Sequence, residues 1–95
     1  MSSSINYLNF ILDQLIELDG VSYKKMMGEY LLYYQGKLFG GIYDDRMLVK
    51  IVDTNKKYNM EKALPYDGAK EMFLVDSVDD RDLLKEIVLN TCVGL

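Results

Sequence analysis

The sequence contains no histidine and a single cysteine, Cys92, among its 95 residues. Histidine is the usual general base near neutral pH and the commonest transition-metal ligand, so Ser–His and Cys–His nucleophiles cannot be built. One cysteine cannot form an internal disulfide, which fits a reducing compartment. Cys92 lies in the last turn of an apolar helical pattern, where it is most simply a small buried hydrophobe. The composition argues against conventional enzyme machinery, and we expect no cofactor.

Basic residues and long apolar runs are also scarce. Eleven Lys and Arg against fifteen Asp and Glu give a net charge of −4, which disfavours a dedicated nucleic-acid binder because phosphate binding needs clustered cations. The N-terminus lacks the basic region of a secretory signal, and its apolar residues are interrupted by Asp13, Gln14 and Glu17. No Ser/Gly/Pro-rich linker divides the chain. We therefore expect one cytoplasmic domain, residues 1–95, without a membrane span.

Hydrophobic spacing predicts two main helices. Apolar residues at helical intervals indicate a first helix over 5–18, capped by Ser4 and stopped by Gly20. A capping-box pattern, Ser77 followed by Asp80, opens a final helix. Its expected inward stripe is Leu83, Leu84, Ile87, Val88 and Thr91.

Between the helices, the pattern predicts a three-strand meander with strands at about 23–34, 37–43 and 46–52. The expected two-residue turns are Gln35-Gly36 and Asp44-Asp45. A short helix near 55–63, a turn at Asp67-Gly68 and a short strand at 70–76 follow. The fold class is α+β: an antiparallel sheet, made of the meander plus one or two short strands, with the N- and C-terminal helices packed on one face in two layers.

Two-residue turns would place Leu32 opposite Phe39 and Ile42 opposite Met47. Alternation then assigns one set of side chains to the core face: Met27, Leu31, Tyr33, Leu38, Ile42, Met47, Val49 and Ile51. A bulge in either hairpin would exchange the sets. The opposite face is apolar and aromatic with interspersed cations, and its candidate interaction residues are Tyr30, Tyr34, Lys37, Phe39, Tyr43, Arg46 and Lys50. This face could be a protein interface, could be covered by the chain's own helices, or could stack single-stranded nucleic acid.

Three smaller clusters resemble sites. Asp44-Asp45-Arg46 could bind a hard metal ion or perform acid–base chemistry, but adjacent acids at a strand end more often form a turn. Gly40-Gly41 lacks the pattern of a phosphate-binding loop and favours a bulge or a close backbone contact. Glu29, alone among apolar neighbours, is either a perturbed carboxylate or, as we favour, a structural partner of Lys25 or of a backbone amide, or a residue placed on the wrong face by an error in the predicted register.

The stretch KKMMGEYLLYYQGKLFGGIYDDRMLVKIVD resembles the N-terminal domain of the TfoX/Sxy family of competence regulators. Met27, Leu31 and Gln35 depart from the family pattern. The matching positions include Lys25, Tyr33, Tyr34 and Lys50, and the motif residues Met26, Gly28, Glu29, Tyr30, Gly36, Lys37, Phe39, Asp44, Asp45 and Arg46.

This resemblance implies an α+β fold similar to secretion chaperones. It also implies a regulatory role, which the best-known members exert with the cyclic-AMP receptor protein on DNA-uptake genes. Longer members carry a second, helical domain, so we expect a stand-alone N-terminal module. The function expected is that of a non-enzymatic regulatory or protein-interaction module that binds another protein or itself. The alternatives are direct nucleic-acid binding and, third, a metal-dependent enzyme using Asp44, Asp45 and Glu29.

Overall fold

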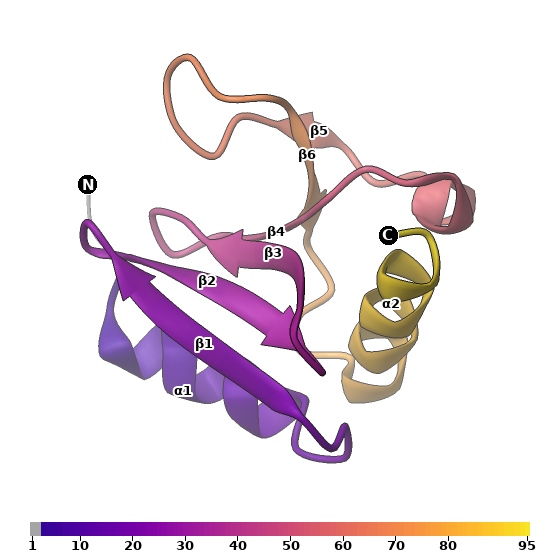
Figure 1. Cartoon of the computed structure of the whole chain (residues 1–95), viewed down its shortest axis with the longest axis horizontal. Helices are drawn as coiled ribbons and strands as arrows, with labels where there is room; N and C mark the ends of the chain where they lie inside the picture. The colour runs from indigo at the N-terminus through magenta and orange to yellow at the C-terminus, as the bar shows by residue number, and fades with distance from the viewer. Residues whose placement is uncertain (1–2) are drawn as a thin grey trace.

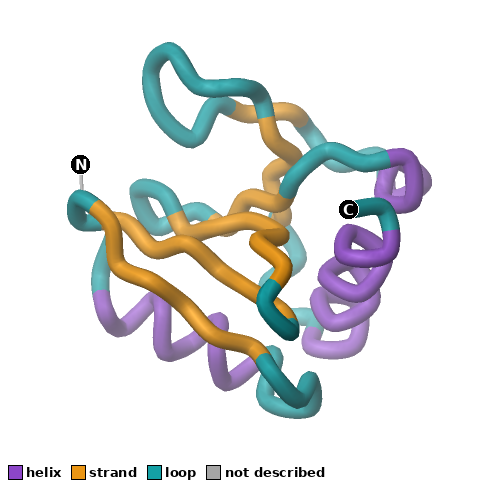
Figure 2. Tube along the Cα trace, in the orientation of Figure 1, coloured by secondary structure: helices purple, strands orange, loops and turns teal. Residues whose placement is uncertain are grey.

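The structure is a computed structural model that describes residues 3–95. The fold consists of one antiparallel sheet and short helices (Figures 1 and 2). The elements in chain order are α1 (Ile5–Gln14), β1 (Val21–Met26), β2 (Glu29–Tyr34), β3 (Lys37–Ile42), β4 (Met47–Val49), the 3₁₀ helix η1 (Asp53–Tyr58), β5 (Lys62–Ala63), β6 (Met72–Val75) and α2 (Arg81–Val93).

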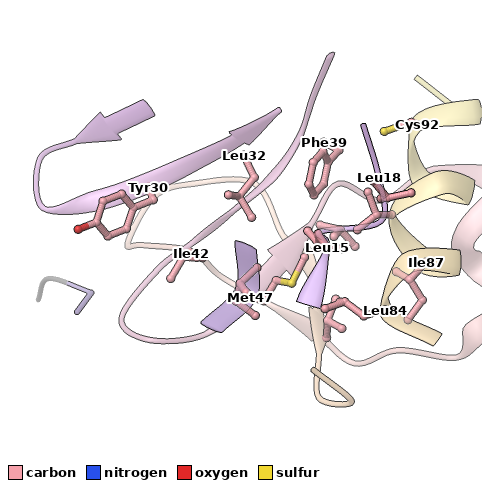
Figure 3. Close-up of a cluster of buried hydrophobic side chains, with 14 of the residues drawn as sticks. Leu15, Leu18, Tyr30, Leu32, Phe39, Ile42, Met47, Leu84, Ile87 and Cys92 are labelled. Atoms are coloured by element: carbon pink, nitrogen blue, oxygen red, sulfur yellow. The ribbon is translucent and has the colours of Figure 1, made fainter. Parts of the chain in front are cut away.

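The six strands form one sheet in the order β1-β2-β3-β4-β6-β5. Both helices bury their apolar stripes against the same face of this sheet, which confirms the predicted α+β class. Figure 3 shows the junction, where Leu84 and Ile87 of α2 lie near Met47 and Leu15. The helix-side face contributes Tyr30, Leu32, Phe39, Ile42, Met47, Val49, Phe73 and Val75 to this core. We call the opposite side of the sheet the open face.

Three tight turns organise the first four strands. The predicted turns Gln35-Gly36 and Asp44-Asp45 are confirmed, and all four residues have positive φ, from 49° to 82°, as type I′ hairpin turns require. The predicted single strand over 23–34 is wrong, because Met27 (φ 53°) and Gly28 (φ 82°) form a third turn that separates β1 from β2. Methionine rarely occupies such a turn, so only the glycine signalled it.

The pairing of β2 with β3 contains a bulge. Ile42 pairs with Met47 as predicted, but Leu32 pairs with Gly40 and not with Phe39. The register shifts between Leu32 and Tyr33, which leaves Phe39 as the extra residue of β3. The predicted faces of β2 are therefore exchanged: the even-numbered residues of β2 point to the helices. The residues of β2, β3 and β6 that carry apolar side chains onto the open face are Leu31, Tyr33, Leu38, Met72 and Leu74.

The helix boundaries differ from the predictions. Ser4 caps α1 as expected, its Oγ accepting from Tyr7 N. The helix ends at Gln14, earlier than predicted, and Gly20 (φ 101°) lies in the later connection to β1. The predicted Ser77 cap is wrong, because Asp80 caps α2 through a 3.1 Å bond from Leu83 N.

The segment after the meander is less helical than predicted. The helix expected over 55–63 is the 3₁₀ helix η1, and Asn59 ends it in a left-handed conformation (φ 54°). Strand β4 is three residues long rather than the seven predicted. The turn at Asp67-Gly68 is confirmed, with Ala69 N donating to Tyr66 O. Within residues 3–95, no helix has the length and apolar character needed to span a membrane.

Candidate functional site

The predicted acid cluster lies at a corner where the N-terminus meets two hairpin turns. The Glu29 carboxylate accepts from the Asp44 backbone N–H at 3.0 Å and from the Ser3 hydroxyl at 2.6 Å. The same hydroxyl accepts from Asp45 N, and the Asp45 carboxylate accepts from Ser4 N at 2.8 Å. The structural interpretation of Glu29, as a partner of a backbone amide, is therefore confirmed. Asp44 and Asp45 form a turn in which Asp44 is bonded to Glu29 and Asp45 is bonded to Ser3 and Ser4.

Arg46 connects this corner to the loop between β5 and β6. Its Nε donates to Tyr43 O at 3.2 Å, and one terminal nitrogen donates to Leu64 O at 3.1 Å. The guanidinium has five donors in a rigid fork, which suits the simultaneous binding of separate carbonyl groups. Arg46 thus positions residues 64–71 beside the sheet.

The seven predicted interaction residues do not form one surface. Tyr30 (4% exposed) and Phe39 (0% exposed) are core residues, so their predicted exposure is wrong. The cause is the bulge, which exchanges the faces of β2 and turns Phe39 toward the core. Tyr34 packs against the core, and Lys37 extends toward the end of α2, with its Nζ 3.5 Å from Cys92 O. The open face retains Tyr43, Arg46 and Lys50.

Tyr43 and Lys50 line a groove of about 480 Å³ on the open face. One wall is formed by Leu38 and Gly40 of β3 with the segment 50–51 that follows β4, and the other by residues between Pro65 and Met72. The Tyr43 ring lies 6.2 Å from the exposed ring of Tyr66, and burial raises the pKa of Tyr43. This groove is mainly aromatic and apolar, its charged lining residues are Lys50, Lys70 and Glu71, and no feature of its lining resembles a catalytic group pair.

The glycine doublet forms part of the sheet near this groove. A Cβ on Gly40 would overlap the Leu48 carbonyl oxygen and lie 2.9 Å from Val49 Cα. A Cβ on Gly41 would lie 2.6 Å from Tyr30 O and 2.7 Å from the Tyr43 ring. The doublet therefore permits close contact between neighbouring strands, as its sequence context indicates, and does not form a phosphate loop.

Cys92 is buried in the core, as predicted. Burial raises the pKa of its thiol, and the nearby Lys37 ammonium opposes this increase only in part. A thiol that is buried and protonated is a poor nucleophile.

A buried polar network joins η1 to α2. Asn55 is fully buried: its amide nitrogen donates to Lys50 O at 2.8 Å and to Thr91 Oγ1 at 2.9 Å, and its oxygen accepts from Val52 N. Nearby, the Tyr58 hydroxyl donates to Glu86 at 2.7 Å, and burial together with this carboxylate raises the pKa of Tyr58 to about 12. This network was not predictable from the sequence, because a single Asn in a polar segment is typical of a turn.

Within residues 3–95, no group of three or more Asp, Glu or Cys side chains is arranged to hold a metal ion. The Asp44 backbone N–H donates to Glu29, and the Asp45 carboxylate accepts from Ser4 N, so these contacts of the cluster are structural.

Comparison with known proteins identifies the class. The model of the TfoX N-terminal domain family matches residues 13–90, and the chain belongs to this family. It is 35% identical over 80 residues to an uncharacterised 12.7 kDa protein encoded in the trpE 5′ region of Spirochaeta aurantia, an alignment that covers 82% of this chain and 70% of that protein. No solved structure matches the chain significantly. Among the residues that carry the resemblance, Glu29, Asp44 and Asp45 lie at the corner, Gly28 and Gly36 lie in tight turns, and Arg46 makes the link to Leu64.

Proposed function

We propose that this protein is a non-catalytic regulatory module that acts by binding another protein, and that it contributes to the transcriptional control of competence. Family membership supports a regulatory role. The observation that carries the binding role is the open face of the sheet. Both helices pack on the other side, yet this face bears apolar and aromatic side chains around the groove.

The composition of the open face fits a protein partner. Leu31, Tyr33, Leu38 and Met72 are each only partly buried, and Tyr66 is 63% exposed. Aromatic residues and Met are enriched at protein interfaces, where they supply large contact areas. Apolar surface on a monomer often marks a binding site, and these partly buried side chains support such a role for the open face.

The test is affinity purification of the tagged chain from its native cell. The bait is compared with Leu38→Asp, which places a charge in the groove, and with Asn9→Asp, which changes an exposed position of α1. We expect a protein that the native chain and Asn9→Asp enrich equally and that Leu38→Asp loses. Equal recovery by all three baits would contradict binding through the open face. Transcripts of DNA-uptake genes in a deletion strain test the regulatory part of the proposal.

Direct nucleic-acid binding is the second candidate, because Lys50 and Lys70 line a groove that contains two tyrosine rings. Such binding predicts a gel shift of single-stranded DNA that weakens steeply with salt. Absence of a shift at about 50 mM salt would exclude it.

A further inference from the structure

Strand β1 is an open edge of the sheet. It pairs with β2 on one side, and no strand follows it in the sheet order. Residues 22–26 are all exposed, and Figure 1 shows β1 at the margin of the sheet with α1 behind it. The other edge, β5, has two residues. An exposed six-residue edge is a template for strand pairing unless the protein protects it.

The alternation of hydrogen-bonded pairs in the first hairpin determines which backbone groups of β1 are not bonded to β2. Gln35 N donates to Gly20 O at 2.9 Å, so Gly20 belongs to a hydrogen-bonded pair. Because such pairs alternate along an antiparallel ladder, the backbone groups of Val21, Tyr23 and Lys25 point away from β2. Their side chains lie on the helix side, since Tyr23 pairs with Leu32 and contacts the ring of Tyr30.

A hollow lies beside these free groups on the helix side. It has a volume of about 600 Å³ and extends from the last residues of α1 to Tyr23. Its apolar lining includes Leu12, Leu15 and Val21, together with Ile16, which is 67% exposed. A strand added to β1 would place alternate side chains against this lining.

The two ends of this edge carry charges of opposite sign. Lys24 and Lys25 are exposed at one end. Neither lysine takes part in an ion pair within residues 3–95, where the pairs are Asp53 with Lys56, Asp13 with Arg81 and Glu17 with Lys85. Asp19 lies at the other end, at the margin of the hollow. A basic edge on a chain of net charge −4 favours an acidic strand at the lysine end, because cross-strand pairs of opposite charge attract.

We propose that β1 binds an extended acidic–apolar peptide segment of a partner protein by strand addition. In the antiparallel orientation the segment places two acidic residues opposite Lys25 and Lys24, apolar residues opposite Tyr23 and Val21, and a basic residue near Asp19. The main-chain bonds supply affinity, and the charges and the hollow supply register. This site is separate from the open-face groove, so a negative binding result at one site does not count against the other.

A second copy of the chain is the weaker occupant. Pairing β1 with itself collects four lysines in one short ladder without a facing acid, and one register sets Lys24 against Lys24. Lysines on an edge strand are a common device against pairing between copies.

The test uses a defined probe, the peptide acetyl-Gly-Glu-Glu-Val-Thr-Ile-Thr-Lys-Gly-amide. The control probe exchanges the charges, with Lys-Lys in place of Glu-Glu and Glu in place of Lys. Titration of the full ¹⁵N-labelled chain to about 1 mM probe should shift the amides of Val21, Tyr23 and Lys25 in a saturable way. The exchanged probe should bind about tenfold more weakly.

Two variants make the test specific. Lys24→Glu with Lys25→Glu should reverse the preference between the two probes. Lys25→Pro removes a donor that points away from the sheet, which edge strands tolerate, and should abolish binding while the spectrum stays dispersed. Three results would overturn the proposal: no edge shifts with the acidic probe, equal binding of both probes by the native chain, or a concentration-independent dimer whose β1 amides are protected from exchange. If the Leu38→Asp bait loses its partner protein, the prediction that β1 binds the acidic peptide is unaffected.

Discussion

Substitution of Asn55 by alanine tests the link between η1 and α2. The side chain makes three hydrogen bonds in a fully buried position. Each is worth about 1 kcal/mol, and buried groups left without partners add to the loss, so we expect Asn55→Ala to reduce the free energy of unfolding by about 3 kcal/mol. For a domain of this size, that corresponds to a fall in Tm of about 15 °C. Urea denaturation at 25 °C, followed by far-UV circular dichroism, measures the change.

Thr91→Val isolates one part of the network. It removes the bond from Asn55 and the hydroxyl's own 2.7 Å bond to Ile87 O, at a cost of about 1 to 1.5 kcal/mol. The double variant should lose less than the sum, by about 0.5 to 1.5 kcal/mol, because the two residues share a bond. Asn9→Ala, at an exposed position, is the control and should change stability by at most about 0.5 kcal/mol. A loss below about 1 kcal/mol for Asn55→Ala, or strict additivity, would refute the reasoning.

Three further predictions concern the sheet and the surface. Gly40→Ala should destabilise the fold by more than about 2 kcal/mol, because its Cβ meets backbone atoms of β4 that cannot move freely; Gly36→Ala, with no atom within 4 Å of its Cβ, should cost about 1 kcal/mol from its positive φ. Glu29→Ala should cost about 1 to 2 kcal/mol in the same denaturation assay, since the Asp44 amide and the Ser3 hydroxyl lose their acceptor. The hydrogen bond to Lys85 lowers the pKa of Glu17, so the contribution of Glu17 is present above the unfolded pKa of about 4.3 and is lost as pH falls through the lower folded value. The stability difference between the native chain and Glu17→Gln should therefore shrink on acidification.

Each of these has a result that contradicts it. Equal effects of the two glycine substitutions would mean that strand contact does not constrain position 40. If Glu29→Ala leaves the free energy of unfolding unchanged, the contacts of Glu29 do not stabilise the fold. A stability difference for Glu17→Gln that is constant from pH 6 to about pH 2 would exclude the ion pair as its source.

The sequence predicted the fold class well and the faces of the sheet poorly. The turns at Gln35-Gly36 and Asp44-Asp45 were predictable because glycine and aspartate tolerate positive φ. The turn at Met27 was not, because the apolar pattern continues through it without interruption. Helix ends were imprecise because Ser77 and Asp80 are both good caps, and the helix begins after Asp80.

The bulge at Phe39 had the larger consequence for the candidate site. A shift of one residue exchanges every side chain of a strand between two faces. Tyr30 was thereby assigned to the surface although it is core, and Leu31, Tyr33 and Leu38 were assigned to the core although they lie on the open face. The sequence indicated that Glu29 binds a backbone amide, but it did not indicate that this amide belongs to Asp44 or that Ser3, 26 residues away, is a second partner.

The succession of tight turns also has a consequence for how the chain folds. Strands β1, β2 and β3 pair with their sequence neighbours across two-residue turns, so little loop entropy opposes their formation. The pairing of β4 with β6 must close the segment 50–71, which contains η1 and β5. Because non-local pairing slows folding, we expect the hairpins to form first and the closure of this segment, with the docking of α2, to set the rate.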